Sequence, residues 1–182
     1  MKVVAVVGMP GSGKGEFSSI AKDMGIPVVI MGDVIREEVQ KQGLVPTDEN
    51  MGKVARSLRE REGMAAIAKV CIPVIKRLQA DLVLVDGVRG EAEVREFARE
   101  FPRFSLISIE APRSLRFSRL SKRGRSDDLA DIRELIARDE RECSFGLNQA
   151  MGLADIRIEN VGTREEFLEK VRALLTRIMA ET

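Results

Sequence analysis

The chain has no histidine, tyrosine or tryptophan, and its only aromatic residues are seven phenylalanines. Histidine is the side chain that most readily exchanges protons near neutral pH, so its absence excludes histidine general bases and Ser-His-Asp triads. Histidine metal sites are excluded for the same reason. Any chemistry must therefore depend on Lys, Arg, Asp and Glu, on backbone dipoles, or on a bound metal ion.

Cysteine and long apolar runs are also scarce. Cys71 and Cys143 are the two cysteines, and their separation matches neither a CxxC pair nor a zinc site, so we interpret them as reduced thiols. No apolar run approaches the roughly 18 residues of a membrane span, and the first residues do not form a secretory signal. We therefore expect a cytoplasmic protein without a membrane segment.

Neither sign of charge dominates. Thirty basic and 29 acidic residues give a net charge of +1. This balance makes nucleic acid an unlikely partner, although it is compatible with a local basic pocket. The length of 182 residues predicts a single domain over residues 1–182 that can bury a proper core.

Short apolar runs rich in β-branched residues alternate with helical patterns. This alternation predicts an α/β fold of three layers, with a five-stranded parallel sheet covered by helices on both faces. The strand-like runs are Val3–Val7, Val28–Met31, Leu82–Val85, Leu106–Ile109 and Ile156–Ile158. The helical patterns include Glu16–Met24, Ser114–Leu120 and Glu165–Ile178, the last opened by a capping box of Thr163 and Glu166.

Residues Gly8 to Gly15 read Gly-Met-Pro-Gly-Ser-Gly-Lys-Gly and lie between a strand-like and a helix-like run. Such a turn lets successive N–H groups converge on phosphate oxygens, while Lys14 reaches the terminal phosphates. The following helix directs its positive end at the same anion. This context favours a phosphate site over an ordinary glycine-rich turn. The expected phosphate-binding residues are Gly8, Met9, Pro10, Gly11, Ser12, Gly13, Lys14, Gly15 and Glu16.

About fifty residues between the second and third strand-like runs carry no strand signal. They predict helices over about Asp33–Gln42, Asp48–Arg61 and Met64–Leu78, the last kinked at Pro73. A helical insert over about residues 32–80, beside a phosphate-binding sheet, would suit the cover of a second substrate. A peripheral packing unit is the alternative.

The start of this insert reads Met-Gly-Asp-Val-Ile-Arg. Asp33 is well placed to cap a helix, and Arg36 follows about one turn later. We interpret Arg36 as an anion-binding residue on the acceptor side and Asp33 as a neighbour of the acceptor. A helix cap beside a surface arginine remains the alternative.

The segment from Leu82 to Arg89 is an apolar strand that ends in Asp-Gly-Val-Arg. Asp86 should lie at the carboxyl edge of the sheet, where ligands bind in such folds. There it could orient Mg²⁺, directly or through water. Arg89 offers a planar fork for a phosphate. A plain Asp-Gly turn is the alternative.

A basic stretch lies late in the chain, in the order Arg116, Arg119, Lys122, Arg123 and Arg125, followed by Asp127 and Asp128. We interpret residues about 119–128 as a short cationic lid, since phosphoryl transfer is catalysed mainly by positioning and charge neutralisation. A solvated charged face is the alternative. The last strand-like run ends in a glycine turn, within Ala154–Gly162, that could touch a base through backbone atoms.

These segments, in this order, resemble the nucleoside monophosphate kinase group of P-loop kinases. Gly8–Gly15 resembles the adenylate kinase phosphate loop, and Asp33 and Arg36 match a Gly-Asp-x-x-Arg segment that holds the acceptor's phosphate. Ala154–Gly162 is closer to the end of dephospho-coenzyme A kinases. The resemblance covers essentially the whole chain, and the nearest pattern is an archaeal branch of adenylate-kinase-like proteins.

The resemblance implies ATP with Mg²⁺ as the donor and a small phosphate-bearing acceptor. It implies that Arg119 stacks on the donor adenine and that Arg123, with Arg125, neutralises charge on the transferred phosphate. It also implies that Arg36 and Arg89 hold the acceptor phosphate. Asp127 and Asp128 resemble the acidic pair that closes the lid in that group.

Three positions depart from the group's pattern. Gly15 removes the hydroxyl that most phosphate loops offer to Mg²⁺, although adenylate kinases share this glycine. Glu16 replaces a small hydroxyl residue beside the α-phosphate, where a carboxylate is unfavourable unless it points away; Ser18 could compensate. The segment from Asp86 to Arg89 is one residue shorter than its adenylate kinase counterpart.

We therefore expect transfer of the ATP γ-phosphoryl group to a small, nucleotide-like acceptor. One alternative is transfer to a hydroxyl, as in dephospho-coenzyme A, for which Asp33 would act as the base. An alternative of another class is an ATP-binding regulatory module or slow ATPase. The sequence leaves the acceptor and the oligomeric state open.

Overall fold

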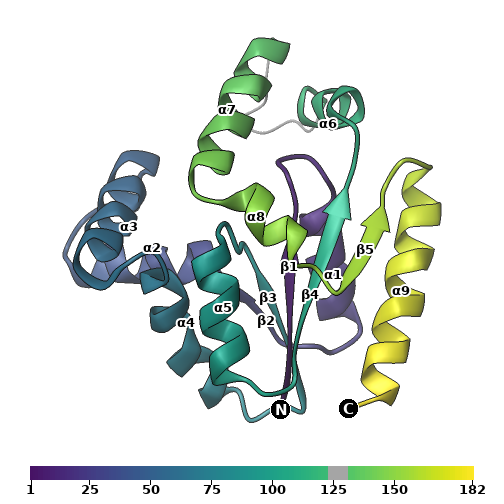
Figure 1. Ribbon diagram of the computed structural model, residues 1–182, viewed down its shortest axis with the longest axis horizontal. Helices are drawn as coiled ribbons and strands as arrows, with labels where there is room; N and C mark the ends of the chain where they lie inside the picture. The colour runs from purple at the N-terminus through teal and green to yellow at the C-terminus, as the bar shows by residue number, and fades with distance from the viewer. Residues whose placement is uncertain (123–130) are drawn as a thin grey trace.

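The computed structural model describes residues 1–122 and 131–182. Within them, five strands form one parallel sheet in the order β2-β3-β1-β4-β5. The strands are β1 (Lys2–Val7), β2 (Val28–Ile30), β3 (Leu82–Asp86), β4 (Phe104–Glu110) and β5 (Ile156–Glu159). All five coincide with the apolar runs of the sequence to within two residues at either end, which confirms the predicted sheet (Figure 1).

The central strand β1 is buried on both faces. Val3, Ala5 and Val7 pack into one apolar cluster, whereas Val4 and Val6 pack into another on the opposite face. This division follows from the two-residue period of a strand, and an uninterrupted apolar run is what a doubly covered parallel strand requires.

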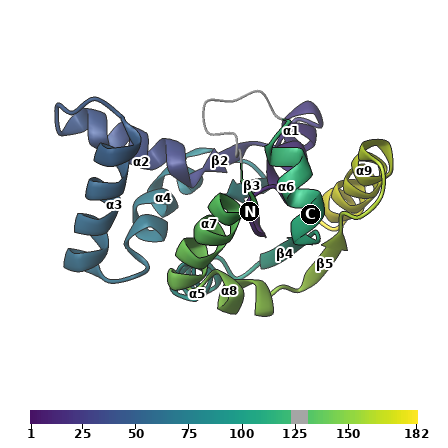
Figure 2. The ribbon, with the colours of Figure 1, turned by 90° about the horizontal axis from the view of Figure 1, so that it is seen from above.

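Helices cover both faces, so the fold is the predicted three-layer α/β fold. α1 (Lys14–Asp23) and α9 (Arg164–Ala180) pack on one face, and the other face is covered mainly by α4 (Ala66–Arg77), α5 (Glu91–Glu100) and α8 (Leu147–Gly152) (Figure 2). The capping box at the start of α9 is present, because Thr163 and Glu166 accept from each other's backbone N–H groups. Every helix in the described residues is too short or too polar to cross a bilayer.

The stretch between β2 and β3 is helical, as the sequence predicts. It contains α2 (Met31–Lys41), α3 (Asp48–Glu62) and α4, and Pro73 lies inside α4. Figure 2 shows α2 and α3 reaching away from the sheet. The prediction of Asp33 as a helix cap is wrong, because α2 begins at Met31 and Asp33 therefore lies within its first turn.

Two further helices follow β4. α6 (Arg113–Leu120) begins as the sequence predicts, and α7 (Ile132–Ser144) follows residues 123–130. α5 and α8 were not assigned from the sequence, and α8 has only six residues, too few to display a helical period. All strands end at the same edge of the sheet, and the loops after β1, β3 and β5 meet there.

Candidate functional site

The loop between β1 and α1 wraps around the side chain of Lys14. Lys14 Nζ donates to the carbonyl oxygens of Gly8 at 2.6 Å and Met9 at 3.2 Å. The ammonium group therefore lies inside the loop, where the two carbonyl oxygens serve as its hydrogen-bond acceptors. The Met9 carbonyl also accepts from the N–H of Ser12 at 3.1 Å.

Two further carbonyls of the loop are held by distant segments. Arg116 Nη1 donates to the Pro10 carbonyl at 3.0 Å, and Asn160 Nδ2 donates to the Ser12 carbonyl at 2.8 Å. A loop that binds anions must direct its N–H groups inward, so its carbonyls need partners elsewhere. Arg116 on α6 and Asn160 after β5 supply them.

Two glycines of the loop cannot be replaced without strain. Gly11 has φ of +78° and Gly13 has φ of +116°, both in the region that favours glycine. A Cβ atom on Gly13 would lie 2.6 Å from Asn160 Nδ2, and one on Gly11 would lie 2.9 Å from the Arg116 carbonyl oxygen. The glycines thus allow the loop to lie against the segments that hold its carbonyls.

Burial lowers the pKa of Lys14 from its ordinary value to about 8, the largest cause being removal of the ammonium from water. The negative charges of Asp86 and Glu142 oppose this shift, and the positive charges of Arg89 and Arg138 reinforce it. Lys14 therefore lies among two carboxylates and two guanidinium groups at one edge of the sheet. An arriving phosphate would favour its charged form.

Asp86 ends β3 and is paired in register with Ile30, the last residue of β2. Its Oδ2 accepts from the buried hydroxyl of Ser18 at 2.7 Å, and Ser18 lies one helical turn after Lys14. Among the described residues, no group of three or more cysteine or carboxylate side chains could hold a metal alone. One carboxylate with a hydroxyl fits Mg²⁺ nonetheless, because this ion retains waters and takes other ligands from phosphates.

Arg119 on α6 contacts the turn after β5. Its Nη2 donates to the backbone carbonyl of Asn160 at 3.0 Å and to the side-chain oxygen of Asn160 at 3.1 Å. Its Nη1 is buried, as is Ser12 Oγ, and neither atom has a hydrogen-bond partner within the described part of the chain. Buried groups of this kind are costly unless a ligand or water satisfies them.

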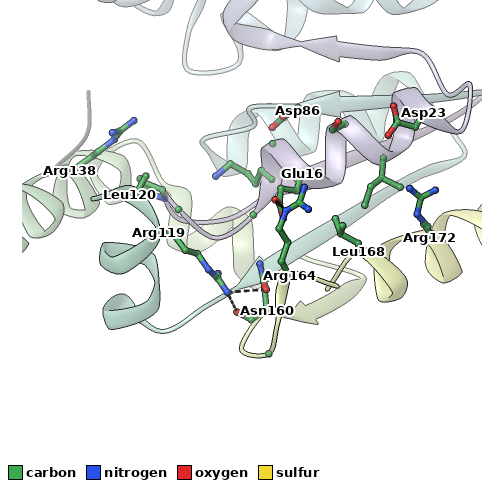
Figure 3. A pocket seen from close by; sticks show the side chains of 18 residues that line it. Glu16, Asp23, Asp86, Arg119, Leu120, Arg138, Asn160, Arg164, Leu168 and Arg172 are labelled. Atoms are coloured by element: carbon green, nitrogen blue, oxygen red, sulfur yellow. Dashed lines mark hydrogen bonds and ion pairs between the residues drawn. The ribbon is translucent and has the colours of Figure 1, made fainter. Parts of the chain in front are cut away.

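A cavity of about 810 Å³ opens beside the loop, and Figure 3 shows the side chains that line it. It runs from Arg119 and Arg138, past the loop and Asp86, and along the groove between α1 and α9. Its volume falls in the range of small-molecule sites, roughly 300–1,000 Å³. The lining residues are Pro10, Gly11, Gly13, Lys14, Gly15, Glu16, Ser19, Ile20, Asp23, Asp86, Arg119, Leu120, Arg138, Asn160, Gly162, Arg164, Leu168 and Arg172.

Arg116 forms a buried ion pair that could not be predicted from the sequence. Its two terminal nitrogens donate to the two carboxylate oxygens of Asp139 at 2.9 and 2.7 Å, and its Nε donates to the Ala111 carbonyl at 3.2 Å. Both charged side chains are about 95% buried. Arg116 thus binds both carboxylate oxygens of Asp139 and joins α6 to α7.

Arg89 is half-exposed at the end of the β3–α5 loop. Its Nη1 lies 3.4 Å from Glu142 Oε1, and its backbone N–H donates to Glu93 at 2.8 Å. Glu93 also lies 3.4 Å from Arg59 Nη2 on α3, and burial raises the pKa of this carboxyl. The guanidinium of Arg59 stacks 5.1 Å above the ring of Phe145. This ion-pair chain joins α3 to α5 and α7.

Asp33 and Arg36, expected on the acceptor side, form an exposed ion pair with each other on α2. Neither lines the cavity beside the loop. Glu16, named among the expected phosphate-binding residues, lines the cavity and is paired with Arg164 at the start of α9. Gly15 has open space around it.

The remaining predicted residues, Arg123, Arg125, Asp127 and Asp128, lie outside the described residues, so their roles stay predictions. Of the residues that the sequence missed, Asn160 carried the clearest signal, since it precedes the glycine turn already singled out. Arg116, Asp139 and Arg164 are ordinary charged residues of helices, and their partners lie far away in the sequence.

The chain has close relatives among proteins of methanogenic and other archaea. It is 54% identical to a UPF0200 protein of Methanoregula boonei over 96% of both chains. It is 53% identical to a UPF0200/UPF0201 protein of Archaeoglobus fulgidus, of which it spans 56% of the length. A family model described as AAA domain matches residues 7–135, more than half of the chain.

Solved structures share the fold at low sequence identity. TT1252 from Thermus thermophilus aligns with a TM-score of 0.67 at 17% identity, over 97% of both chains. Dephospho-CoA kinase from Campylobacter jejuni aligns with 0.64 at 15% identity, over 98% of both. Shikimate kinase from Acinetobacter baumannii, in complex with shikimate, aligns with 0.58 at 16% identity, over 100% of this chain and 95% of that one. The chain thus belongs to the UPF0200 family of AAA-domain proteins and has the fold of the P-loop kinases.

Proposed function

We propose that the protein transfers the γ-phosphoryl group of ATP to a small, nucleotide-like acceptor. The observation that carries the proposal is the loop around Lys14. Side chains hold its Gly8, Met9, Pro10 and Ser12 carbonyls, and the cavity beside it is lined by a buried group that has no partner within the described residues. This group is Arg119 Nη1, which would gain a partner from a bound nucleotide. Charge also supports this reading, because Lys14, Arg119, Arg138, Arg164 and Arg172 outnumber the acids Glu16, Asp23 and Asp86 in the cavity lining.

On the donor side, Lys14 would leave the carbonyls of Gly8 and Met9 and bind the terminal phosphates. The N-terminus of α1 would stabilise the same charge, and Arg119 would contact the base. Asp86, with the hydroxyl of Ser18 that donates to it, would hold Mg²⁺, which supplies charge neutralisation at the phosphates.

On the acceptor side, we propose that the helical insert over residues 32–80 and Arg89 supply the binding residues. Arg89 is half-exposed. Its Nη1 lies 3.4 Å from the carboxylate of Glu142, which is long for a hydrogen bond, so Arg89 can exchange this partner for an anion. Arg36 is exposed on the first helix of the insert and would take part once it leaves Asp33.

The structural neighbours support a second class of acceptor. Both dephospho-CoA kinase and shikimate kinase have names that denote acceptors other than nucleoside monophosphates. A hydroxyl acceptor must lose a proton, whereas a phosphate acceptor is already anionic, so only the hydroxyl needs a base. Asp33 is the residue that we propose for this role.

The test is ADP production from Mg-ATP with AMP, CMP, UMP, GMP, dephospho-coenzyme A, shikimate or no acceptor. Stimulation by one acceptor, abolished by Lys14→Ala, would support a kinase and identify its substrate. Asp33→Asn would leave a monophosphate kinase largely active but reduce a hydroxyl kinase by about 10²–10⁴-fold. Equal slow turnover with every compound would instead indicate a regulatory ATPase, and the acceptor roles of Arg36 and Arg89 would fail.

A further inference from the structure

The donor cavity contains a carboxylate where a polyphosphate must pass. Glu16 lies two residues after Lys14, in the first turn of α1, and lines the cavity with it. A nucleoside triphosphate held by Lys14 at its terminal phosphates would extend its remaining phosphate along this turn. The negative charge of Glu16 would oppose that phosphate unless a cation compensates.

Arg164 supplies this cation. It is the first residue of α9, and its Nε donates to Glu16 Oε1 across the groove between α1 and α9. The carboxylate of Glu16 raises the pKa of Arg164 further, through a hydrogen bond and through charge, so the guanidinium remains charged. Figure 3 shows the two side chains meeting beside the phosphate loop, close to Asn160.

The ion pair leaves part of the guanidinium available. The Arg164 side chain is 64% exposed and that of Glu16 is 37% exposed, so neither is locked by packing. Exposed pairs of this kind contribute little to stability, and a guanidinium has donors beyond the one at Nε. Arg164 and Glu16 both line the cavity, so the guanidinium is accessible to a ligand bound there.

We propose that Arg164 is a second phosphate-binding cation of the donor site, and that Glu16 positions it. The ligand is the phosphate of ATP nearest the nucleoside, bound by Arg164 while Lys14 binds the terminal phosphates. The proposal rests on the proposed donor site but not on the identity of the acceptor. It explains why the chain tolerates a carboxylate in the first turn after its phosphate loop.

The test is the dissociation constant of Mg-ATP, measured by isothermal titration calorimetry for wild type and three variants. Arg164→Met keeps the length of the side chain and removes its charge, and we expect it to weaken ATP binding about tenfold. Arg164→Lys keeps the charge and should recover most of the affinity. Arg177→Met, a matched substitution on an exposed arginine of α9 outside the cavity, should match wild type.

Glu16→Gln separates ligand binding from a purely structural ion pair. If Arg164 binds phosphate, this variant removes repulsion and frees the guanidinium, so ATP should bind equally well or more tightly. If the pair only joins α1 to α9, Glu16→Gln and Arg164→Met should lower the melting temperature alike and leave ATP affinity unchanged. That result would overturn the proposal.

Two other outcomes would also decide against it. One is an ATP affinity of Arg164→Met that lies within twofold of wild type. The other is a loss of ATP affinity in Arg177→Met as large as that in Arg164→Met. Either result would show that Arg164 has no specific role. Failure of the wild-type protein to bind ATP would overturn the proposed function as well. The two failures are distinguishable because only the second removes the difference between wild type and Lys14→Ala.

Discussion

At the scale of single residues, the shape of the phosphate loop depends on the hydrogen-bond partners of its carbonyl groups. Lys14, Arg116 and Asn160 donate hydrogen bonds to the loop carbonyls of Gly8, Pro10 and Ser12 and so hold the path of the backbone. The glycines matter because they let these partners approach closely.

Gly13→Ala should destabilise the protein by about 2–4 kcal/mol, because φ of +116° is unfavourable for alanine and the new Cβ would collide with Asn160 Nδ2. ATP binding should fall with it, since Asn160 holds the Ser12 carbonyl. Gly15→Ala is the control: it meets nothing within 4 Å and should be as stable as wild type or gain up to about 1 kcal/mol. Denaturant unfolding measures both, and equal stability of the two variants would contradict the prediction.

Lys14 should make ATP binding depend on pH. Its pKa in the free protein is about 8, and phosphate binding requires the charged form. ATP affinity should therefore be constant below about pH 8 and weaken by up to tenfold for each pH unit above it. Folding has the opposite sign: the unfolded lysine keeps its proton to about pH 10.5, so this residue favours the folded state increasingly as pH rises from 8.

Calorimetric titrations with ATP from about pH 7 to pH 10 would measure the effect. Lys14→Ala provides the reference, since it removes the titrating group and should remove the break in the profile. A wild-type affinity that stays constant through this range would show that Lys14 remains charged, and would exclude the lowered pKa.

At the scale of secondary-structure elements, the strands and most helices could be predicted because each is specified by its own residues. A strand such as Val3–Val7 can be predicted from its own uninterrupted apolar run, without knowing which strands lie beside it. α8 could not be predicted, because six residues show no period. The cap proposed for Asp33 failed because α2 begins directly at the end of β2, without a separate capping residue.

The connection between α6, α7 and the phosphate loop should be the most sensitive of these elements to mutation. Arg116 is buried, holds both oxygens of Asp139 and donates to the Pro10 carbonyl. Asp139→Leu should cost about 3–5 kcal/mol, because it leaves a buried guanidinium without its counter-ion. Arg116→Met should cost less, since Arg113 Nε lies 3.4 Å from Asp139 and can partly compensate.

The double variant Arg116→Met with Asp139→Leu should recover most of the lost stability, since an apolar pair can replace a buried ion pair. It should still bind ATP more weakly than wild type, because the Pro10 carbonyl has lost its donor. Denaturant unfolding and ATP titration together distinguish the two effects. Wild-type ATP affinity in the double variant would show that Arg116 serves stability alone.

At the scale of the whole molecule, the site is assembled from segments that the sequence separates widely. Glu16 and Arg164 are 148 positions apart, as are Ser12 and Asn160, and both pairs meet because β1 and β5 end at the same edge of the sheet. The residues of the phosphate loop could be predicted because they are contiguous. The partners that hold the loop could not, because only the strand order brings them together.

The internal hydrogen bonds of Lys14 have a consequence for selectivity. In the free loop its ammonium already has two carbonyl acceptors, at 2.6 and 3.2 Å, so an arriving anion must compete with the protein's own backbone. The net gain from binding is an exchange energy and not the full strength of an ammonium–phosphate contact. If the loop binds ATP as proposed, a polyphosphate with several charges should displace these carbonyls from Lys14, whereas a singly charged anion such as chloride should not. Lys14 would then select its ligand by charge as well as by shape.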